Sequence, residues 1–569
     1  MTLSATVQLL LWLALLLAAV RPLGSYMHRV FAGEATILSP LLRPVETALY
    51  RMAGVRPDQE QEWHRYALSF LAYHLPGMLL LYLLLRLQDR LPLNPAGQAA
   101  VPPDLALNTV ISFATNTSWQ SYGGETTLGH LSQMAGIAVQ SFLSAAAGIA
   151  VAIALTRGFA RRGSATIGNF WVDATRATLY VLLPICVLSS LIMAWQGVPQ
   201  TFSGPVATVT LEGAKQAISL GPVASQEAIK LLSGDGGGFF NAQSAHPFEN
   251  PTTLTNLLGM LLMPLIGAAL TNTFGRMVGD ERQGWALLAT MLVLLLVGAV
   301  ALQVIETGGN PLLAGAGLDQ GMGNLEGKEL RFGVPGSTLF SELGTATSSG
   351  AVNAMHDSYL PLSGLVLLGN MMLDEVIIGG PGSGLFGMLL FAVVAVFISG
   401  LMIGRTPEYL GNKIEAREVK LTMLALLAVP AALLVLTAVA VVIPAGLTAL
   451  GNAGPHGFTE VLYAYTSAVN TNGSSFAGLS TNTPFYNLTL AVGMAIGRFM
   501  VVVPVLALAG SLATRRRVAD SQGTLPTTGG LWVGLLLGVI VIVGGLTYLP
   551  ALALGPVAEH MAILGGATF

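Results

Sequence analysis

Apolar stretches almost free of charge recur along this sequence, and each is close to the roughly 20 residues that a helix needs to cross the apolar core of a bilayer. They occupy residues 3–20, 66–85, 132–155, 174–195, 254–273, 285–304, 359–373, 383–404, 421–446, 484–512 and 531–553. Only a short segment separates 359–373 from 383–404, and it contains Asp374, Glu375 and a Gly-Gly-Pro-Gly sequence at 379–382. We interpret these two stretches as one broken helix. The sequence therefore predicts an all-α polytopic membrane protein with ten transmembrane helices.

The overall composition agrees with a membrane protein and excludes other classes. Of the 569 residues, 53% are hydrophobic and 10% are charged, whereas about a quarter of the residues of a soluble domain are charged. The net charge of −3 offers no basic surface for nucleic acid. The single cysteine, Cys186, permits neither an intramolecular disulfide nor a cysteine metal cluster.

The distribution of Lys and Arg predicts the orientation in the membrane. Nineteen of the 26 Lys and Arg residues lie in the segments that follow the first, third, fifth, seventh and ninth spans. Because positively charged loops stay on the cytoplasmic side, both termini are predicted to be extracytoplasmic. The stretch 3–20 lacks the basic start and the cleavage site of a signal peptide, so we expect it to be retained. Charged and apolar residues alternate over 405–420, which suggests a helix along the inner surface.

Four loops on the predicted outer side contain a short, partly apolar stretch that ends in small, oxygen-rich residues. With Asn116, Asp235, Ser349 and Asn472 aligned, the preceding residues are Thr, Gly, Ser and Thr, and the following ones are Thr, Gly, Gly and Gly. Any one of these segments alone is typical of an ordinary turn. Four in register, each between two spans, favour a helix, a re-entrant pore loop and a second helix, used four times around one central pore.

Such loops have the composition of a site for a dehydrated cation. Glycine adopts backbone angles that aim several carbonyl groups in one direction, and a ring of carbonyls can replace the water around an ion. Each short helix would also point its negative C-terminal end at the ion. The predicted filter residues are Thr115, Asn116, Thr117, Gly234, Asp235, Gly236, Gly237, Ser348, Ser349, Gly350, Thr471, Asn472 and Gly473.

The repeat divides the chain into six parts. They are the first transmembrane helix with its cytoplasmic loop (1–65), pore repeat 1 (66–170), pore repeat 2 (171–284), pore repeat 3 with the broken second helix (285–419), pore repeat 4 (420–520) and the last transmembrane helix (521–569).

The break in the third repeat predicts a gate or a tunnel entrance below the filter, with Glu375, Gly382 and Gly384 in or beside it. Residues 382–387 match the G-x-G-x-x-G pattern, but no strand precedes them, so we do not expect dinucleotide binding. Arg498 lies inside the ninth span, where a charge is expensive. Asp374 or Glu375 is its expected counter-ion, and both a structural ion pair and electrostatic control of the ion route are consistent with that pairing.

Five motifs closely resemble those of one protein family. They read TNTSWQSY at 115–122, GGGFFN at 236–241, HPFENP at 246–251, VNAMHDS at 352–358 and GRTPEYLG at 404–411. On these motifs, and on similarity from Pro22 to the last spans, the chain resembles the potassium-binding A subunit of the bacterial Kdp potassium-importing ATPase.

The resemblance implies a potassium-selective, channel-like subunit that binds K⁺ from outside in its filter. It also implies that K⁺ passes through an intramembrane tunnel to a P-type ATPase subunit of the KdpB kind, in the bacterial inner membrane. Small accessory subunits of the KdpC and KdpF kinds and membrane lipid are the other implied partners, and K⁺ is the transported ion without an organic cofactor.

ATP chemistry is expected to belong to the partner, because the chain contains no Asp-Lys-Thr-Gly phosphorylation motif. The chain is then not an enzyme by itself. Two alternatives are a stand-alone potassium symporter or channel of the same superfamily, and an intramembrane enzyme. No nucleophile–base pair or set of metal ligands within the spans supports the enzyme.

The second filter segment departs from the family pattern. The family usually has Gly-Thr-Asn-Gly-Gly-Gly where this chain has Ser-Gly-Asp-Gly-Gly-Gly at 233–238. The carboxylate of Asp235 either faces the ion and strengthens its capture, or points away and caps the turn through its own backbone.

Overall fold

The computed structural model describes residues 3–373, 376–404, 407–516 and 525–566 of the chain. Within these residues, ten helical segments are long and apolar enough to cross a membrane, which confirms the predicted number of spans. The helices that form them are α1 (Leu3–Ala32), α3 (Trp63–Leu87), α6 (Val139–Ala160), α7 (Phe170–Arg176) with α8 (Leu183–Trp195), α10 (Thr253–Val278), α11 (Glu281–Thr307), α15 (Ser383–Ile403), α16 (Ala416–Ala440), α19 (Pro484–Ala495) with α20 (Val501–Thr514), and α21 (Gly530–Leu552) with α22 (Ala558–Leu564).

Four of these spans contain a wider, π-helical stretch. These stretches are η2 (Ser132–Ala138), η3 (Ala177–Leu182), η6 (Ile496–Met500) and η7 (Ala553–Val557). A π-helical turn inside an α-helix often marks a functional position, and η6 carries Arg498.

Four further helices are too short to span and lie among the long ones. They are α4 (Pro103–Ala114), α9 (Val223–Leu232), α13 (Gly333–Ala346) and α18 (Gly454–Val469). The remaining short elements are α2 (Ser39–Ala53), η1 (Gln88–Arg90), α5 (Gly124–Thr127), η4 (Gln243–Ala245), α12 (Pro311–Gly315), η5 (His356–Ser358), α14 (Pro361–Met372) and α17 (Pro444–Leu447).

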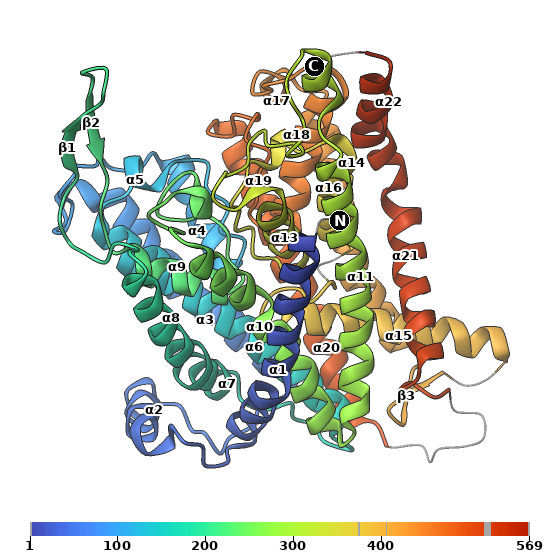
Figure 1. The fold of residues 1–569 in the computed structure, drawn as a ribbon. Helices are drawn as coiled ribbons and strands as arrows, with labels where there is room; N and C mark the ends of the chain where they lie inside the picture. The colour runs from blue at the N-terminus through green and yellow to red at the C-terminus, as the bar shows by residue number, and fades with distance from the viewer. Residues whose placement is uncertain (1–2, 374–375, 405–406, 517–524, 567–569) are drawn as a thin grey trace.

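The predicted broken helix is two separate helices. α14 is a short helix of 12 residues, and α15 alone is long enough to span. In Figure 1, α15 runs across the neighbouring helices, and its far end projects beyond α21. The seventh span in chain order is therefore supplied by α15 rather than by the two helices together.

Two small hairpins interrupt the helical architecture. Strand β1 (Val206–Val209) pairs antiparallel with β2 (Lys215–Ile218), and β3 (Glu408–Tyr409) pairs antiparallel with β4 (Asn412–Lys413). The helix predicted over 405–420 is wrong over 407–415, because a left-handed pair at Leu410 and Gly411 turns the chain back on itself, and α16 begins only at Ala416.

The loops lie at two opposite ends of the bundle. The loops that follow odd-numbered spans lie at one end and those that follow even-numbered spans lie at the other, as the distribution of Lys and Arg predicts. Figure 1 shows α2 and β3 at the lower end, and the β1–β2 hairpin, α17 and α22 at the upper end. Local sequence fixes the turns at the lower end. Between α10 and α11, Gly279 adopts a left-handed conformation, and the side chain of Asp280 accepts a hydrogen bond from Arg282 N to cap α11.

The interior is built around α6, a helix rich in alanine. Its residues from Ser144 to Phe159 are all buried, and it packs closely against α20 and α10. Small side chains permit this close approach between helices. At the periphery, α1 lies along α10, where Trp12 Nε1 donates a hydrogen bond to the carbonyl of Met260 over 2.9 Å. The bundle thus holds the four short helices in a fixed frame.

Candidate cation-binding site

The four short helices α4, α9, α13 and α18 end in the same way. In each, the residue after the C-cap has a positive φ: 65° at Asn116, 62° at Gly234, 56° at Ser348 and 55° at Thr471. This left-handed residue stops the helix and turns the chain into an extended segment. All four helices therefore present their C-terminal ends, which carry partial negative charge, at the start of a predicted filter segment.

The hydrogen bonds behind these turns define the register of the segments. In three of them an N–H group donates to the carbonyl five residues earlier: Thr117 to Ser112 over 2.9 Å, Asp235 to Lys230 over 3.0 Å, and Asn472 to Ser467 over 2.8 Å. Thr117, rather than Asn116, therefore corresponds to Asp235 and Asn472. The predicted alignment of the first segment is wrong by one residue, because the end of α4 at Ala114, and not side-chain similarity, sets the register.

The first three segments contact one another through side chains and carbonyl groups. Asn116 Nδ2 donates hydrogen bonds to the carbonyl oxygens of Ser233 and Gly234, each over 3.1 Å. Ser349 Oγ donates to the carbonyl oxygen of Asp235 over 3.2 Å. The first segment is thus held to the second, and the second to the third.

The fourth segment closes the ring. Asn472 Nδ2 donates to the carbonyl of Gly344, at the end of α13, over 2.9 Å. On its other side, Gly473 lies so close to the first segment that an added Cβ would overlap the carbonyl oxygen of Thr117. Segments that are far apart in the sequence therefore form one closed ring, and every predicted filter residue in it is buried.

The glycines of the second segment are required for different reasons. Gly237 has a φ of +67°, and a Cβ there would lie 2.8 Å from the Gln120 side chain. Gly236 and Gly238 do not have positive φ values. They are needed for space instead, because a Cβ would lie 3.2 Å from the Gly350 backbone in one case and 2.6 Å from Glu249 Oε1 in the other.

Asp235 points back toward its own segment. Its Oδ2 accepts a hydrogen bond from Ser233 Oγ over 2.7 Å, so the observed partner of the carboxylate is a hydroxyl rather than the backbone N–H of the predicted cap. The side chain is fully buried. Burial raises the pKa of Asp235 to about 6, against hydrogen bonds from Ser141 and Ser233 that lower it.

A loop between α14 and α15 lies against the ring. Gly379 N donates to the carbonyl of Ala346 over 3.0 Å, and Gly380 N donates to Ser348 Oγ over 3.1 Å. The loop then turns through Gly382, whose φ is +104° and where a Cβ would overlap the carbonyl of Gly148 in α6. A Cβ at Gly384 would overlap the carbonyl of Ile378. The structure thus places Gly382 against α6 and Gly384 against Ile378, next to the glycines that contact the third segment.

Arg498 lies close to the same loop. Its Nη2 donates to the carbonyl of Ser144 over 2.9 Å, and its side chain is buried. It lines a cavity together with Ser383, Asn470 and Thr471, so the arginine borders the space between α15 and the fourth filter segment. Its predicted counter-ions, Asp374 and Glu375, lie outside the described residues.

Buried ion pairs support the second segment from outside the ring, and sequence reasoning missed them. Lys230 in α9 lies 2.8 Å from Glu249 and 2.6 Å from Glu227, with all three side chains at most 3% exposed. Glu249 Oε1 also accepts from Phe240 N over 2.8 Å. In the sequence, Lys230 is one of the few Lys and Arg residues outside the segments that follow the odd-numbered spans. Its spacing of three residues from Glu227 was the available signal for a pair on one helix face.

Chemically, the site is a buried ring of carbonyl, hydroxyl and amide oxygens at the negative ends of four helices, and Asp235 adds one carboxyl group to it. Such a ring suits a monovalent cation stripped of its water. The fold and the ring together define a class of protein, the polytopic helical membrane proteins that carry cations.

Comparisons with known proteins agree with this class. The family model "Potassium-transporting ATPase A subunit" matches residues 10–561. A potassium-transporting ATPase potassium-binding subunit from Methylorubrum populi is 62% identical over 569 residues, covering 100% of this chain and 99% of the relative. Proteins of the same description from Granulibacter bethesdensis and Mesorhizobium japonicum are 62% and 58% identical, and the matches cover 97% and 100% of both chains, respectively. This chain therefore belongs to the family of potassium-transporting ATPase A subunits.

A solved structure shares the fold. The potassium transporter TrkH from Vibrio parahaemolyticus matches with a TM-score of 0.52 at 14% sequence identity, covering 88% of this chain and 98% of the transporter. At that identity the likeness shows the arrangement of helices alone.

Proposed function

We propose that this chain is the potassium-binding, non-catalytic subunit of an ATP-driven potassium importer. In this function K⁺ enters the ring of four segments from the outer side, loses its water there and passes inward to a partner that hydrolyses ATP. The observation that carries the proposal is the closed ring. Hydrogen bonds connect the first three segments and hold the fourth to α13, and Gly473 lies against Thr117, so buried oxygens surround one place at four helix C-termini.

The proposed ligands are the oxygens of Thr115–Thr117, Gly234–Gly237, Ser348–Gly350 and Thr471–Gly473. Support comes from the common turn geometry, which gives each segment a left-handed residue at the same distance from its helix end. A four-fold pseudosymmetric arrangement of helix, pore loop and helix explains why the four C-caps carry the same geometry.

We also propose that the loop at 376–384, with Glu375 and Arg498, is a gate or tunnel entrance on the inner side of the ring. The contacts of Gly379 and Gly380 with the third segment support this role. The cavity beside Arg498 supports a route that leaves the ring between α15 and α16 toward a P-type ATPase subunit.

The importer is proposed to lie in the bacterial inner membrane with both termini of this chain outside, on the basis of the positive charges that follow the odd-numbered spans. A P-type ATPase subunit and small accessory subunits would complete it. The names of the relatives, which describe a potassium-binding subunit of an ATPase, support that assembly.

The test is to purify the chain from its native cells together with the proteins that bind it. ATP hydrolysis is then assayed for the complex and for the isolated chain. We expect a P-type ATPase to co-purify and its ATP hydrolysis to rise with K⁺ much more than with Na⁺. The isolated chain should hydrolyse no ATP. ATP-independent K⁺ uptake into vesicles by the isolated chain, with no ATPase bound, would instead establish a stand-alone transporter.

A further inference from the structure

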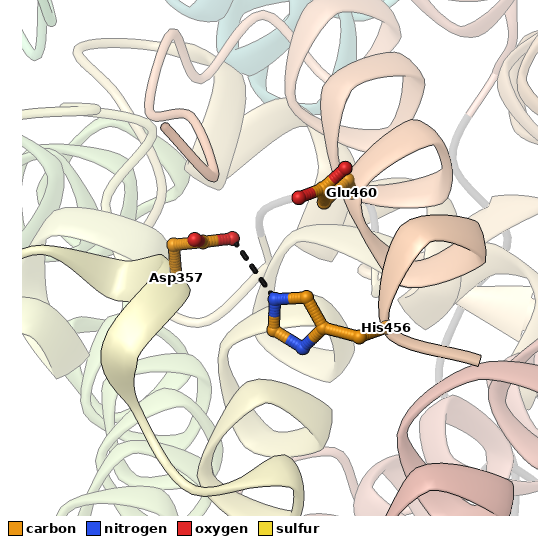
Figure 2. A group of neighbouring side chains, drawn as sticks. All are labelled: Asp357, His456 and Glu460. Atoms are coloured by element: carbon orange, nitrogen blue, oxygen red, sulfur yellow. Dashed lines mark hydrogen bonds and ion pairs between the residues drawn. The ribbon is translucent and has the colours of Figure 1, made fainter. Parts of the chain in front are cut away.

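A second group of potential cation ligands lies away from the ring, at the upper end of the bundle. His456 and Glu460 are four residues apart in the first turns of α18, so they share one face of that helix. Asp357 reaches the same place from η5, in the arm that returns from the third filter segment. Figure 2 shows the three side chains directed toward a common point.

The distances suit a shared ion. One ligand atom from each of the three residues lies within 4.8 Å of the other two. His456 Nε2 is 3.2 Å from Asp357 Oδ1, which is close to the edge of a tetrahedron around a metal with ligand distances of roughly 2.0–2.2 Å. A small movement of Glu460 would complete the set.

The position of the Glu460 carboxylate is not explained by the ion pair between His456 and Asp357. Glu460 is fully buried, and in the part of the chain that the structure describes no ion pair joins it to a cationic side chain. Its hydrogen bonds come from Asn452 Nδ2 and Gly451 N, over 2.8 and 3.2 Å. An added Cβ at Gly478 would meet both Glu460 Oε1 and Asp357 Oδ2, so the two carboxylates lie beside the same glycine. Two carboxylates directed at one buried point repel each other unless a cation lies between them.

A fourth residue orients the histidine. Glu559 in α22 lies 2.8 Å from His456 Nδ1 and directs the ring so that Nε2 faces Asp357 and Glu460. A carboxylate on one nitrogen of an imidazole whose other nitrogen binds a metal is a recurring arrangement, and it fixes the tautomer and orientation of the ligand.

We propose that Asp357, His456 and Glu460 bind a divalent transition-metal ion of the zinc kind, with Glu559 as the residue that positions His456. One imidazole nitrogen and two carboxylate oxygens are a normal ligand set for Zn²⁺, and water would take the fourth position. On binding, the metal replaces the proton at Nε2, which leaves to solvent, while Nδ1 keeps its proton toward Glu559. The site adds a function to the chain that is separate from its proposed role in potassium transport.

The metal would clamp three parts of the structure. It would join the return arm of the third filter segment, the start of α18 and, through Glu559, the C-terminal α22. Beside Asp357, His356 Nδ1 contacts Tyr463 Oη over 2.8 Å, and Tyr463 contacts Ser474 Oγ over 2.8 Å. Ser474 Oγ then donates to Asn472 Oδ1 over 2.6 Å. The site is therefore connected to the fourth filter segment by hydrogen bonds.

The experiment uses the full-length protein without a histidine tag, stripped with a chelator and titrated with Co²⁺ in detergent. We expect one Co²⁺ per chain with the intense visible bands of four-coordinate cobalt, displaced by Zn²⁺. Glu460→Gln and Asp357→Asn should each weaken binding at least about tenfold, and Glu559→Gln should weaken it by roughly 10–100-fold. Asp319→Asn, an exposed carboxylate elsewhere, is the matched control and should change nothing.

Two outcomes would overturn the proposal. One is a wild-type protein without four-coordinate bands at saturating Co²⁺, a result that does not depend on the folding of any variant. The other is an unchanged spectrum in Glu460→Gln. Either would leave His456 as a protonated imidazole paired with two carboxylates. A His456→Cys variant gives an independent check, because a bound Co²⁺ would then show sulfur-to-metal charge transfer.

Discussion

The filter ring and the layer outside it are held together by opposite means. Within the ring, amide and hydroxyl groups donate to backbone carbonyls, as Asn116, Ser349 and Asn472 do. The layer outside is held by buried ion pairs such as Lys230–Glu249 and Lys328–Glu306, each at 2.8 Å. A fixed ammonium beside the ion would repel it, and a fixed carboxylate would hold it too strongly. Apart from Asp235, full charges such as these lie outside the proposed filter ring, where they stabilise the frame.

The largest effect is expected when a charge is removed from the layer outside the ring, because its buried ion pairs should stabilise the fold. Lys230→Met would leave Glu227 and Glu249 buried without their cation, and we expect a loss of roughly 3–5 kcal/mol in the free energy of unfolding. The measurement is denaturant-induced unfolding in micelles. Lys230→Met combined with Glu249→Gln should recover part of the loss. Lys215→Met, on an exposed strand, is the control, and an equal loss there would contradict the argument.

A change inside the ring should act on the ion rather than on the frame. Gly473→Ala would push a Cβ into the carbonyl oxygen of Thr117 at a φ of +98°. We expect the apparent K⁺ affinity of the complex to fall at least about tenfold, or about 1.4 kcal/mol, while assembly persists. Gly213→Ala is the control, since its φ is +85° with no atom near the added Cβ.

The second segment offers a graded version of the same test. Gly237→Ala combines strain at φ +67° with a contact at 2.8 Å, whereas a Cβ at Gly236 meets the Gly350 backbone at 3.2 Å without a positive φ. Gly237→Ala should therefore lower K⁺ affinity more than Gly236→Ala. If Gly236→Ala, Gly237→Ala and Gly238→Ala all kept the wild-type K⁺ affinity and selectivity, the proposal that this segment is part of the filter would be wrong.

Arg498 is a buried charge that borders a cavity beside the fourth segment. Arg498→Met removes the bond to the Ser144 carbonyl, and we expect transport to fall by several-fold. If Glu375 is the counter-ion, the double change with Glu375→Gln should transport better than Arg498→Met alone, because a buried partner is no longer left unpaired. Additive losses in this cycle would argue against the pairing, and Asp374→Asn would then be tested.

The smallest effect is expected at Asp235, the exception to a neutral ring. With its pKa raised to about 6 by burial, the carboxyl is ionised at neutral pH and becomes protonated as the outside is acidified below pH 6. Ionised, it attracts K⁺, so acidification should weaken K⁺ activation. Two unit charges about 4 Å apart attract by roughly 4 kcal/mol at an effective dielectric of 20. Because Ser233 already donates to this carboxylate, we expect only about 1 kcal/mol of that attraction, or roughly fivefold. The measurement is half-activation by K⁺ against external pH. Asp235→Asn should show no such dependence, and parallel curves for the two proteins would show that the carboxylate does not affect the ion.

Much of the fold could be predicted because bilayer thickness limits what an apolar stretch can do. The spans at 132–155 and 254–273, for example, lie within observed membrane-crossing helices. The ends of the four short helices were also recognisable, because each carries small oxygen-rich residues after an apolar stretch, and their role as a filter stays a prediction. The break between α14 and α15 was recognisable from the Gly-Gly-Pro-Gly sequence at 379–382, but the sequence did not show that α15 alone would be long enough to span.

The details of the site depended on contacts that are distant in sequence. The register of the first segment follows from the backbone hydrogen bond between Thr117 and Ser112, which leaves no trace in the residue types. Lys230 looked like a loop charge because its partner Glu249 is 19 residues further along. Asp357 and His456 are 99 residues apart and carry no motif spacing, so only the packing of α18 brings them together.

The closed ring can form only after the last part of the chain that contacts it has been synthesised. Asn108, on the helix of the first segment, donates to the carbonyl of Asn487, which lies 379 residues later. At bacterial translation rates this interval lasts on the order of 20–80 s. Throughout it, the early segments sit in the translocating machinery or the lipid without their last neighbour. A ribosome that stops before the fourth segment therefore releases an incomplete ring, and a prematurely ended chain cannot become a partly working filter.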